Sequence, residues 1–363
     1  MFMGGAKTTL AGHEATDLVA KAFLGVRLQC AQCHDHPFAD WSHADYWGVA
    51  AFFTQTRISD KFPGNPSPAA TKNEDASQVG SRWGVQDIEH TNDKHKHPDR
   101  GLDLPPTYLR GDRARLVAGE TRRQAFARWL TAADNPWFAR AMVNRIWAQL
   151  FGRGLVNPVD DLSSDNPASH PELFEGLTAQ FVAHGYDVKF LIRAICHTVA
   201  YQRSSAGPAD ENEAESEFDY RRMQVKVCSP EQLFDALLEL LGPEGMDHRG
   251  RVDRARDGFV ELFTTDDEHD AINYRRGIPQ ALKLMNHWTY EKALARRAEQ
   301  ETQGRSQAEA IERLYLLTLS RHPDAAESKL AAEYVNRYED QPARGYAGLL
   351  WALMNSSEFT LNR

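Results

Sequence analysis

The stretch NPWFARAMVNRIWAQLFG, residues 135–152, carries the pattern that decides the fold class. Pro136 stands at a first helical position, Phe138, Met142 and Ile146 recur at helical spacing, and Gly152 ends the run. The same apolar spacing predicts further helices over the ranges 17–29, 122–133, 188–200, 279–300, 306–320, 324–338 and 343–355. We therefore expect a mainly α fold, with a multi-helix domain that follows a small irregular N-terminal segment.

Three capping signals predict where helices begin. Ser169 and Glu172 have the spacing of a capping box, before a helix that ends at Gly185. Asp187 is the expected cap of the run 188–200. Ser229 and Gln232 repeat the capping box before an apolar run that ends at Gly242.

Two stretches lack helical periodicity. Residues 54–120 are rich in Pro, Gly, Asn, Asp and Lys, which is typical of a small irregular subdomain or a linker. Residues 205–219 form an acidic loop with few apolar side chains. The expected organisation is therefore an N-terminal region over 1–55, an irregular loop or linker over 56–120, and a helical domain over 121–363.

Composition excludes several classes of protein. The chain has 363 residues, with 42 basic and 51 acidic side chains and a formal net charge of −9. This balance argues against binding to nucleic acid or to an anionic membrane, since such proteins normally show a basic patch. No apolar run reaches the length of about 18 residues that a membrane span needs. The first residues also lack the basic start and apolar run of a signal peptide.

One pentapeptide, Cys30-Ala31-Gln32-Cys33-His34, has the attachment signature of c-type haem. In that signature the two thiols add to the porphyrin vinyl groups, and the neighbouring imidazole becomes an axial ligand of the iron. Nearby aromatic residues are the expected lining of the ring: Phe23, Phe38, Trp41, Tyr46, Trp47, Phe52 and Phe53. We therefore expect Cys30 and Cys33 as haem anchors and His34 as the axial ligand.

Other interpretations of the same residues stay open. Cys30 and Cys33 with two of three nearby histidines, His34, His36 and His43, would form a Cys₂His₂ zinc site. A non-haem iron or copper site would use His34, His36 and a carboxylate from Asp35 or Asp40. Alternatively, the two thiols are structural or form a local redox pair. The other cysteines, Cys196 and Cys228, are expected to be buried small apolar residues.

Further candidate residues are weaker. For the second axial position His43 is one candidate, whereas His36 is too close to His34 to cross to the other face of the ring. Asp161 and His170, with Asp160 and Asp165, lie between two expected helices and could pair as acid and base. Two charged runs are expected to be solvated loops rather than metal sites: Asp93 with His95 and His97, and residues 266–270.

The sequence also resembles two families. FLGVRLQCAQCHDHPFADWSHADYWGVAAFF, residues 23–53, resembles the C-terminal end of the planctomycete cytochrome-like domain DUF1549. Residues 122–363 resemble its usual partner DUF1553, through the range 126–205 and the segments RRGIPQALKLMNH, LYLLTLSRHPDAAE and LLWALMNSSEF. The resemblance implies a large exported protein, periplasmic or extracellular, often with an attached cytochrome domain and sometimes with carbohydrate-binding modules.

The expected function is that of an exported c-type haem protein that transfers electrons to a redox partner protein or an attached cytochrome domain. One alternative is a metal-binding or catalytic domain that acts on an extracellular polysaccharide, with Asp161 and His170 as its candidate site. Another is a helical scaffold without chemistry. The sequence assigns no enzyme class, and it predicts haem c as the cofactor, with zinc or iron as alternatives.

Overall fold

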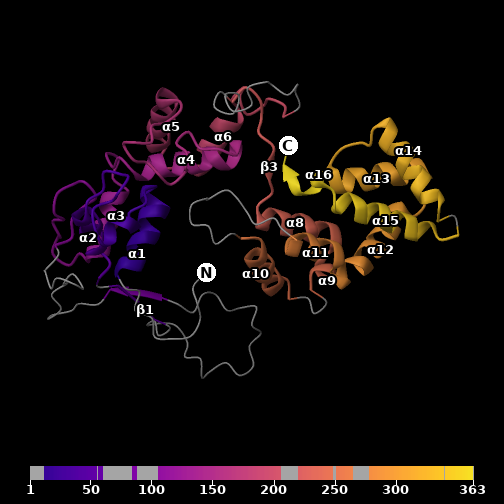
Figure 1. Cartoon of the computed structure of the whole chain (residues 1–363), viewed down its shortest axis with the longest axis horizontal. Coiled ribbons are helices and arrows are strands. Elements are labelled where there is room, and N and C mark those ends of the chain that lie inside the picture. Colours follow the sequence, from indigo (N-terminus) through magenta and orange to yellow (C-terminus); the bar gives the residue numbers. More distant parts are fainter. Residues whose placement is uncertain are drawn as a thin grey trace. The chain divides into compact units, whose positions relative to one another are not determined.

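The structure is a computed structural model of the chain, and it describes residues 12–54, 56–59, 84–87, 105–205, 220–247, 251–264, 278–338 and 340–362. Contacts between residues divide the chain into two compact units, Met1–Gln202 and Arg203–Arg363, called unit 1 and unit 2 below. Helices predominate in the described parts of both units (Figure 1). The predicted mainly α fold is confirmed.

Unit 1 begins with helices that precede and follow the cysteine motif. In chain order its elements are α1 (Gly12–Val19), η1 (Ala20–Leu24), η2 (Gln29–Gln32), α2 (His43–Ala50), β1 (Thr56–Ser59), β2 (Gly84–Asp87), α3 (Arg122–Leu130), α4 (Phe138–Phe151), α5 (Pro171–Ala183) and α6 (Val188–Cys196). Strands β1 and β2 pair antiparallel, with Thr56 opposite Asp87. The cysteine motif therefore lies between helical elements, at η2.

The residues just after α2 pack against α3. The Phe52 and Phe53 rings each lie 5.2 Å from the Phe126 ring, and Phe52 also stacks on Tyr108 at 5.2 Å. Arg122 donates a hydrogen bond of 2.9 Å to the carbonyl oxygen of Ala51. Burial of each such aromatic side chain stabilises the fold by roughly 1.5–3 kcal/mol. This aromatic cluster joins the N-terminal region to the helices beyond residue 121.

The helix predicted over 17–29 ends earlier, at Leu24. Helix α1 continues into the π-helical turn η1, and Gly25 follows with a φ of 65°. A Cβ at Gly25 would lie 2.9 Å from side-chain atoms of Ala141 and Leu162, so only glycine fits this close approach to α4. Because η1 ends at Leu24, the cysteine motif does not follow directly on the expected helix; residues 25–28 lie between η1 and η2.

Helix α4 also begins two residues later than predicted. Asn135 accepts hydrogen bonds from the amides of Trp137 and Phe138, at 2.9 and 3.0 Å, and so holds Pro136 outside the helix. The predicted stop at Gly152 is confirmed, with a φ of 81°. The buried face is wider than the predicted stripe and includes Trp147, whose ring stacks on another helix residue, Phe151, at 4.2 Å.

The predicted capping box at Ser169 is wrong. The Ser169 hydroxyl donates a hydrogen bond of 3.1 Å to the Leu155 carbonyl oxygen, and the N-cap residue of α5 is His170, whose side chain makes no capping bond. The Ser169 hydroxyl thus bonds to Leu155, which lies outside the helix, and not to the first turn of the helix as the spacing predicts. The Asp187 cap is confirmed, because its carboxylate accepts from the amides of Lys189 and Phe190 at the start of α6.

Unit 2 is built from helices packed around one apolar core. Its elements are β3 (Lys226–Val227), α8 (Pro230–Leu241), α9 (Pro243–Met246), α10 (Val252–Phe263), α11 (Ile278–Asn286), α12 (Trp288–Thr302), α13 (Gln307–Leu319), α14 (Ala325–Asn336), α15 (Pro342–Met354), α16 (Ser357–Thr360) and β4 (Leu361–Asn362). Strands β3 and β4 pair antiparallel. Fully buried leucines from four of these helices form the centre of the core: Leu237, Leu294, Leu314 and Leu350.

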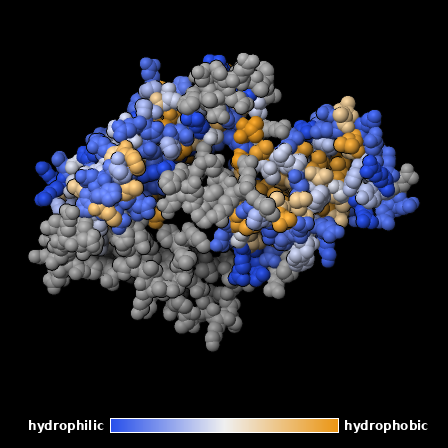
Figure 2. All heavy atoms as spheres, viewed as in Figure 1, coloured by the Kyte–Doolittle hydropathy of each residue, from blue (hydrophilic) through white to orange (hydrophobic). Residues whose placement is uncertain are grey.

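Three described helices of unit 2 begin with a capping box, in which a Ser or Asp precedes a Gln or Glu by three positions. The Ser229–Gln232 box is confirmed at α8, and the same arrangement begins α13 at Ser306 and α14 at Asp324. The helix predicted over 279–300 is instead two helices, α11 and α12, which His287 separates. On the face shown in Figure 2, apolar side chains gather over the helices of unit 2.

The division of the chain by contacts differs from the predicted domain boundaries. Residues 1–55 and 121–202 belong to one unit, and the division at Gln202 falls inside the predicted 121–363 domain. Sequence families and contact units divide a chain by different criteria, so the predicted boundaries stay a prediction. Most of the expected loops, 56–120 and 205–219, lies outside the described residues. Within the described ranges, no helix has the length and apolar character of a membrane span.

Candidate functional site

The Cys30 and Cys33 thiols lie on the surface of unit 1, in and just after a short 3₁₀ turn. Residues Gln29–Gln32 form η2, and the fully buried Ala31 anchors this turn to the core. In a 3₁₀ helix, side chains three positions apart eclipse each other. Both cysteines are exposed and free of disulfides. The two thiols are therefore placed toward the same side of the turn, open to solvent.

His34 has one ring nitrogen held by the backbone. Its Nδ1 lies 2.6 Å from the carbonyl oxygen of the adjacent Asp35. A carbonyl oxygen only accepts, so Nδ1 must carry the proton, and in the neutral ring the lone pair is on Nε2. His34 is exposed and no hydrogen bond to Nε2 is made by the described residues. This ring is thus oriented as a metal-ligating histidine usually is, with a carbonyl behind it.

His36 and His43 are bound differently. The Nδ1 of His36 accepts hydrogen bonds from the amides of Phe38 and Ala39, at 3.2 and 2.9 Å, so its proton is on Nε2. The Nε2 of His43 accepts from the indole nitrogen of Trp47 at 3.1 Å. In both rings the lone pair that a metal would need is already used in a hydrogen bond.

The two carboxylates proposed for a non-haem iron site also have structural partners. Asp35 accepts a hydrogen bond of 2.7 Å from the amide of His43, near the start of α2. Asp40 pairs with Arg110 at 2.8 Å, and the Arg110 guanidinium lies 4.5 Å from the centre of the Trp41 ring. Among the described residues, no cluster of three or more His, Cys, Asp or Glu side chains is arranged to hold a metal ion.

The expected aromatic lining is mostly in the core of unit 1 instead. Five of the seven residues are buried: Trp41, Tyr46, Trp47, Phe52 and Phe53. The other two are exposed, Phe38 at 87% and Phe23 at 43%. Burial raises the pKa of the Tyr46 phenol, and the Asp17 carboxylate and the Cys33 thiol raise it further. Cys33 therefore interacts electrostatically with this buried phenol. Cys30, Cys33 and His34 are thus exposed, whereas five of the seven aromatic residues expected to line a haem are buried in the protein.

Asp161 and His170 make local contacts. The carbonyl oxygen of Asp161 accepts from the side-chain amide of Asn166, and the His170 ring contacts the hydroxyl of Ser169. The neighbouring Asp160 is buried and pairs with Arg145 at 2.8 Å. A cavity of about 380 Å³ adjoins this loop, and neither Asp161 nor His170 lines it. The histidines at 95 and 97 and the acidic run 266–270 lie outside the described residues.

Sequence reasoning missed a second cavity, which lies in unit 2. It has a volume of about 400 Å³, and its lining includes Phe259, Lys283 and His287. The available signal was the spacing of four between Lys283 and His287, within the segment RRGIPQALKLMNH. That spacing places two titratable groups on one face of a helix end.

The fold and the exposed motif define a helical protein with a surface CxxCH segment. Comparison with known families gives the assignment: residues 122–278 match the model described as protein of unknown function DUF1553, and residues 6–58 match that of DUF1549, also of unknown function. The cysteine motif lies within the part of the chain that matches DUF1549. No curated protein and no solved structure matches the chain.

Proposed function

We propose that the chain is a c-type haem protein, with thioether bonds to Cys30 and Cys33 and axial ligation through Nε2 of His34. The observation that carries the proposal is the state of these three residues together. The thiols are free, exposed and one 3₁₀ turn apart, and His34 alone of the three neighbouring histidines keeps an uncommitted ring lone pair among the described contacts. These are the requirements for covalent attachment.

The side chains around the motif favour haem over zinc. A Cys₂His₂ zinc site would need a second histidine beside His34. If His36 were that ligand through Nδ1, it would lose its hydrogen bonds from the amides of Phe38 and Ala39. If His43 were that ligand through Nε2, it would lose its hydrogen bond from the Trp47 indole. A single histidine with two thiols satisfies the haem requirement without breaking either arrangement.

A bound haem would supply one-electron redox chemistry. The Asp35 carbonyl would orient the His34 ring and fix its tautomer, since it accepts the Nδ1 proton. The exposed position of Cys30, Cys33 and His34 would make the site accessible to a redox partner protein or an attached cytochrome domain. Because c-type haem is attached outside the cytoplasm, the proposal includes a periplasmic or extracellular location.

The alternative of catalysis on a polysaccharide at Asp161 and His170 has less support. Asp161 bonds to the nearby Asn166, His170 contacts its neighbour Ser169, and neither Asp161 nor His170 lines the adjacent cavity.

The test is the absorbance spectrum of the full chain, exported behind an added leader in cells that have the haem-maturation factors. We expect a haem band that stays with the unfolded protein, and its loss in the double variant C30A/C33A. The variants Cys196→Ala and Cys228→Ala are matched controls, because these two cysteines form no disulfide, lie elsewhere in the chain and should not change the band. An unloaded wild-type chain, in cells that load a control cytochrome, would refute the proposal.

A further inference from the structure

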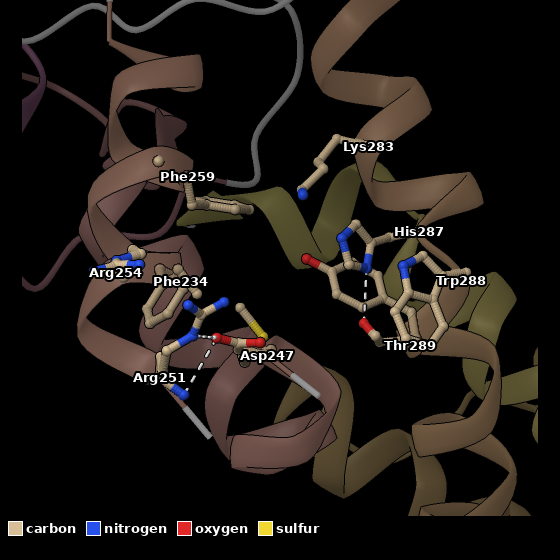
Figure 3. Close-up of a pocket in the computed structure, with 13 residues that line it drawn as sticks. Phe234, Asp247, Arg251, Arg254, Phe259, Lys283, His287, Trp288 and Thr289 are labelled. Atoms are coloured by element: carbon tan, nitrogen blue, oxygen red, sulfur yellow. Dashed lines mark hydrogen bonds and ion pairs between the residues drawn. The ribbon is translucent and has the colours of Figure 1, made fainter. Parts of the chain in front are cut away.

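The cavity of unit 2 lies where α10, α11 and α12 meet. Figure 3 shows the Lys283 ammonium and the Arg251 guanidinium reaching into the space from opposite sides, with the Phe259 ring beside Lys283. The volume, about 400 Å³, falls within the range of small-molecule sites. The cavity thus combines an aromatic wall with convergent cations.

Among the described lining residues, the basic side chains outnumber the acidic ones. Arg251 pairs at 3.2 Å with Asp247, the one carboxylate among those residues. Lys283 and Arg254 make no ion pair within the described part of the chain. Burial lowers the pKa of Lys283, which means that its charge is costly where it lies. A bound anion would remove that cost at Lys283, and the guanidinium of Arg251, which also reaches into the cavity, would be a second hydrogen-bond donor to it.

The tautomer of His287 follows from its neighbours. The Thr289 hydroxyl donates its only proton to the carbonyl oxygen of Gly245, so it can only accept from the His287 Nδ1, 2.7 Å away. The Nε2 of His287 therefore carries the lone pair. Burial first, and then the charge of Lys283, lower the pKa of His287 and keep the ring neutral. A neutral ring with an open Nε2 accepts a hydrogen bond from a hydroxyl group.

We propose that this cavity binds a small organic anion that also carries a hydroxyl group. The oxyanion lies between Lys283 and Arg251, the hydroxyl donates to the Nε2 of His287, and the carbon skeleton rests against Phe259. The class of ligand is thus defined by two cations, one neutral hydrogen-bond acceptor and one apolar wall of the cavity. This site is independent of the cysteine motif, since all its residues belong to unit 2.

Gly258 gives a way to close the cavity without removing a charge. It lines the cavity from α10, and a Cβ built there would have no atom of the other described residues within 4 Å, its own helix backbone aside. A large side chain at this position would therefore extend into open space at the cavity rather than into packed protein.

The experiment is a calorimetric titration of the full chain with two matched pairs of probes: propionate and lactate, and propyl phosphate and glycerol 3-phosphate. Within at least one pair, we expect the hydroxylated member to bind more tightly. Lys283→Met should weaken its binding at least tenfold, whereas Lys292→Met, an exposed lysine of α12 outside the cavity, should leave it unchanged. His287→Phe should abolish the preference for the hydroxylated member.

Gly258→Trp and Gly258→Ala test the location independently of charge. We expect the tryptophan to prevent binding and the alanine to preserve it, with circular dichroism showing that both variants keep the helical fold. The proposal is overturned if no probe binds, if Lys283→Met and Lys292→Met behave alike, or if folded Gly258→Trp binds as the wild type does.

Discussion

The Nδ1 of His34 lies 2.6 Å from the backbone carbonyl oxygen of Asp35, whereas the Nδ1 of His36, two residues further on, accepts from two backbone amides. These opposite hydrogen bonds give the two rings opposite tautomers. His34 presents a lone pair at Nε2, and His36 presents a proton there. Two histidines that look equivalent in the sequence are therefore suited to different roles, one to ligation and one to the shape of the loop.

Substitution of the two histidines should separate these roles. In the haem-loaded protein, His34→Ala should keep both thioether bonds and lose the spectral features of a histidine-ligated iron. His36→Ala should keep that spectrum and lower the free energy of unfolding by roughly 1–2 kcal/mol, because two amides lose their acceptor. Absorbance spectra and urea unfolding measure the two effects. Identical spectra for His34→Ala and the wild type would assign the axial ligand elsewhere.

The buried Asn144 connects α4 to the loop that follows it. Its side-chain amide donates to the carbonyl oxygens of Val156 and Val159, at 2.8 and 2.9 Å, and its oxygen accepts from the Val156 amide at 2.9 Å. Asn144→Ala removes all three bonds and should lower the free energy of unfolding by roughly 2–4 kcal/mol. Chemical unfolding checks this value.

Gln149→Ala is the matched control for Asn144→Ala, since Gln149 is an exposed residue of the same helix. Its effect should stay within about 0.5 kcal/mol. Equal effects of the two substitutions would contradict the role assigned to Asn144.

Gly258 lies inside α10, where glycine is a poor helix former. Since a Cβ at this position meets no neighbouring atom, Gly258→Ala should raise the free energy of unfolding by about 0.5–1 kcal/mol. Thermal unfolding measures the change. A loss of stability would show that the position is more crowded than the structure indicates.

Lys283 should control the protonation of His287. Burial and the ammonium of Lys283 both lower the pKa of this imidazole, while Asp247, Arg251 and Tyr290 also line the cavity. Lys283→Met removes one positive charge, which favours the imidazolium, so the pKa of His287 should rise yet stay below the ordinary histidine value. Nuclear magnetic resonance titration of the ring measures the shift.

The same pKa has a consequence for stability. A histidine whose pKa is lowered by folding takes up its proton more readily in the unfolded chain, so acidification through the ordinary histidine range destabilises the fold. Lys283→Met should reduce the loss of stability on acidification, and Lys292→Met should leave it unchanged. If the two variants have the same His287 pKa, Lys283 does not act on this ring.

Local signals predicted much of the helical structure. The capping residues Asp187 and Ser229 begin α6 and α8 as expected, and Gly152 ends α4. These signals succeed because the hydrogen bonds involved join residues within one turn. Ser169 has the same local pattern and fails, since its hydroxyl is taken by Leu155, a residue from an earlier part of the chain.

The environment of the motif could not be predicted in the same way. Spacing identified Cys30, Cys33 and His34, but it could not show that Trp41 and Phe52 pack on partners far along the sequence, Trp137 and Phe126. The break at His287 also depends on tertiary contacts, because its ring nitrogen meets Thr289, whose hydroxyl bonds to Gly245. Long-range packing, rather than local preference, decides which aromatic and titratable groups are accessible.

The most direct test of the central claim is mass spectrometry of the tryptic peptide 28–57, which begins after Arg27, ends at Arg57 and contains both cysteines of the motif. The peptide is taken from the full chain, exported in cells with haem-maturation factors. We predict that it carries the mass of one haem, bound through both Cys30 and Cys33. Recovery of the peptide with both thiols unmodified, beside a fully loaded control cytochrome, would contradict the account.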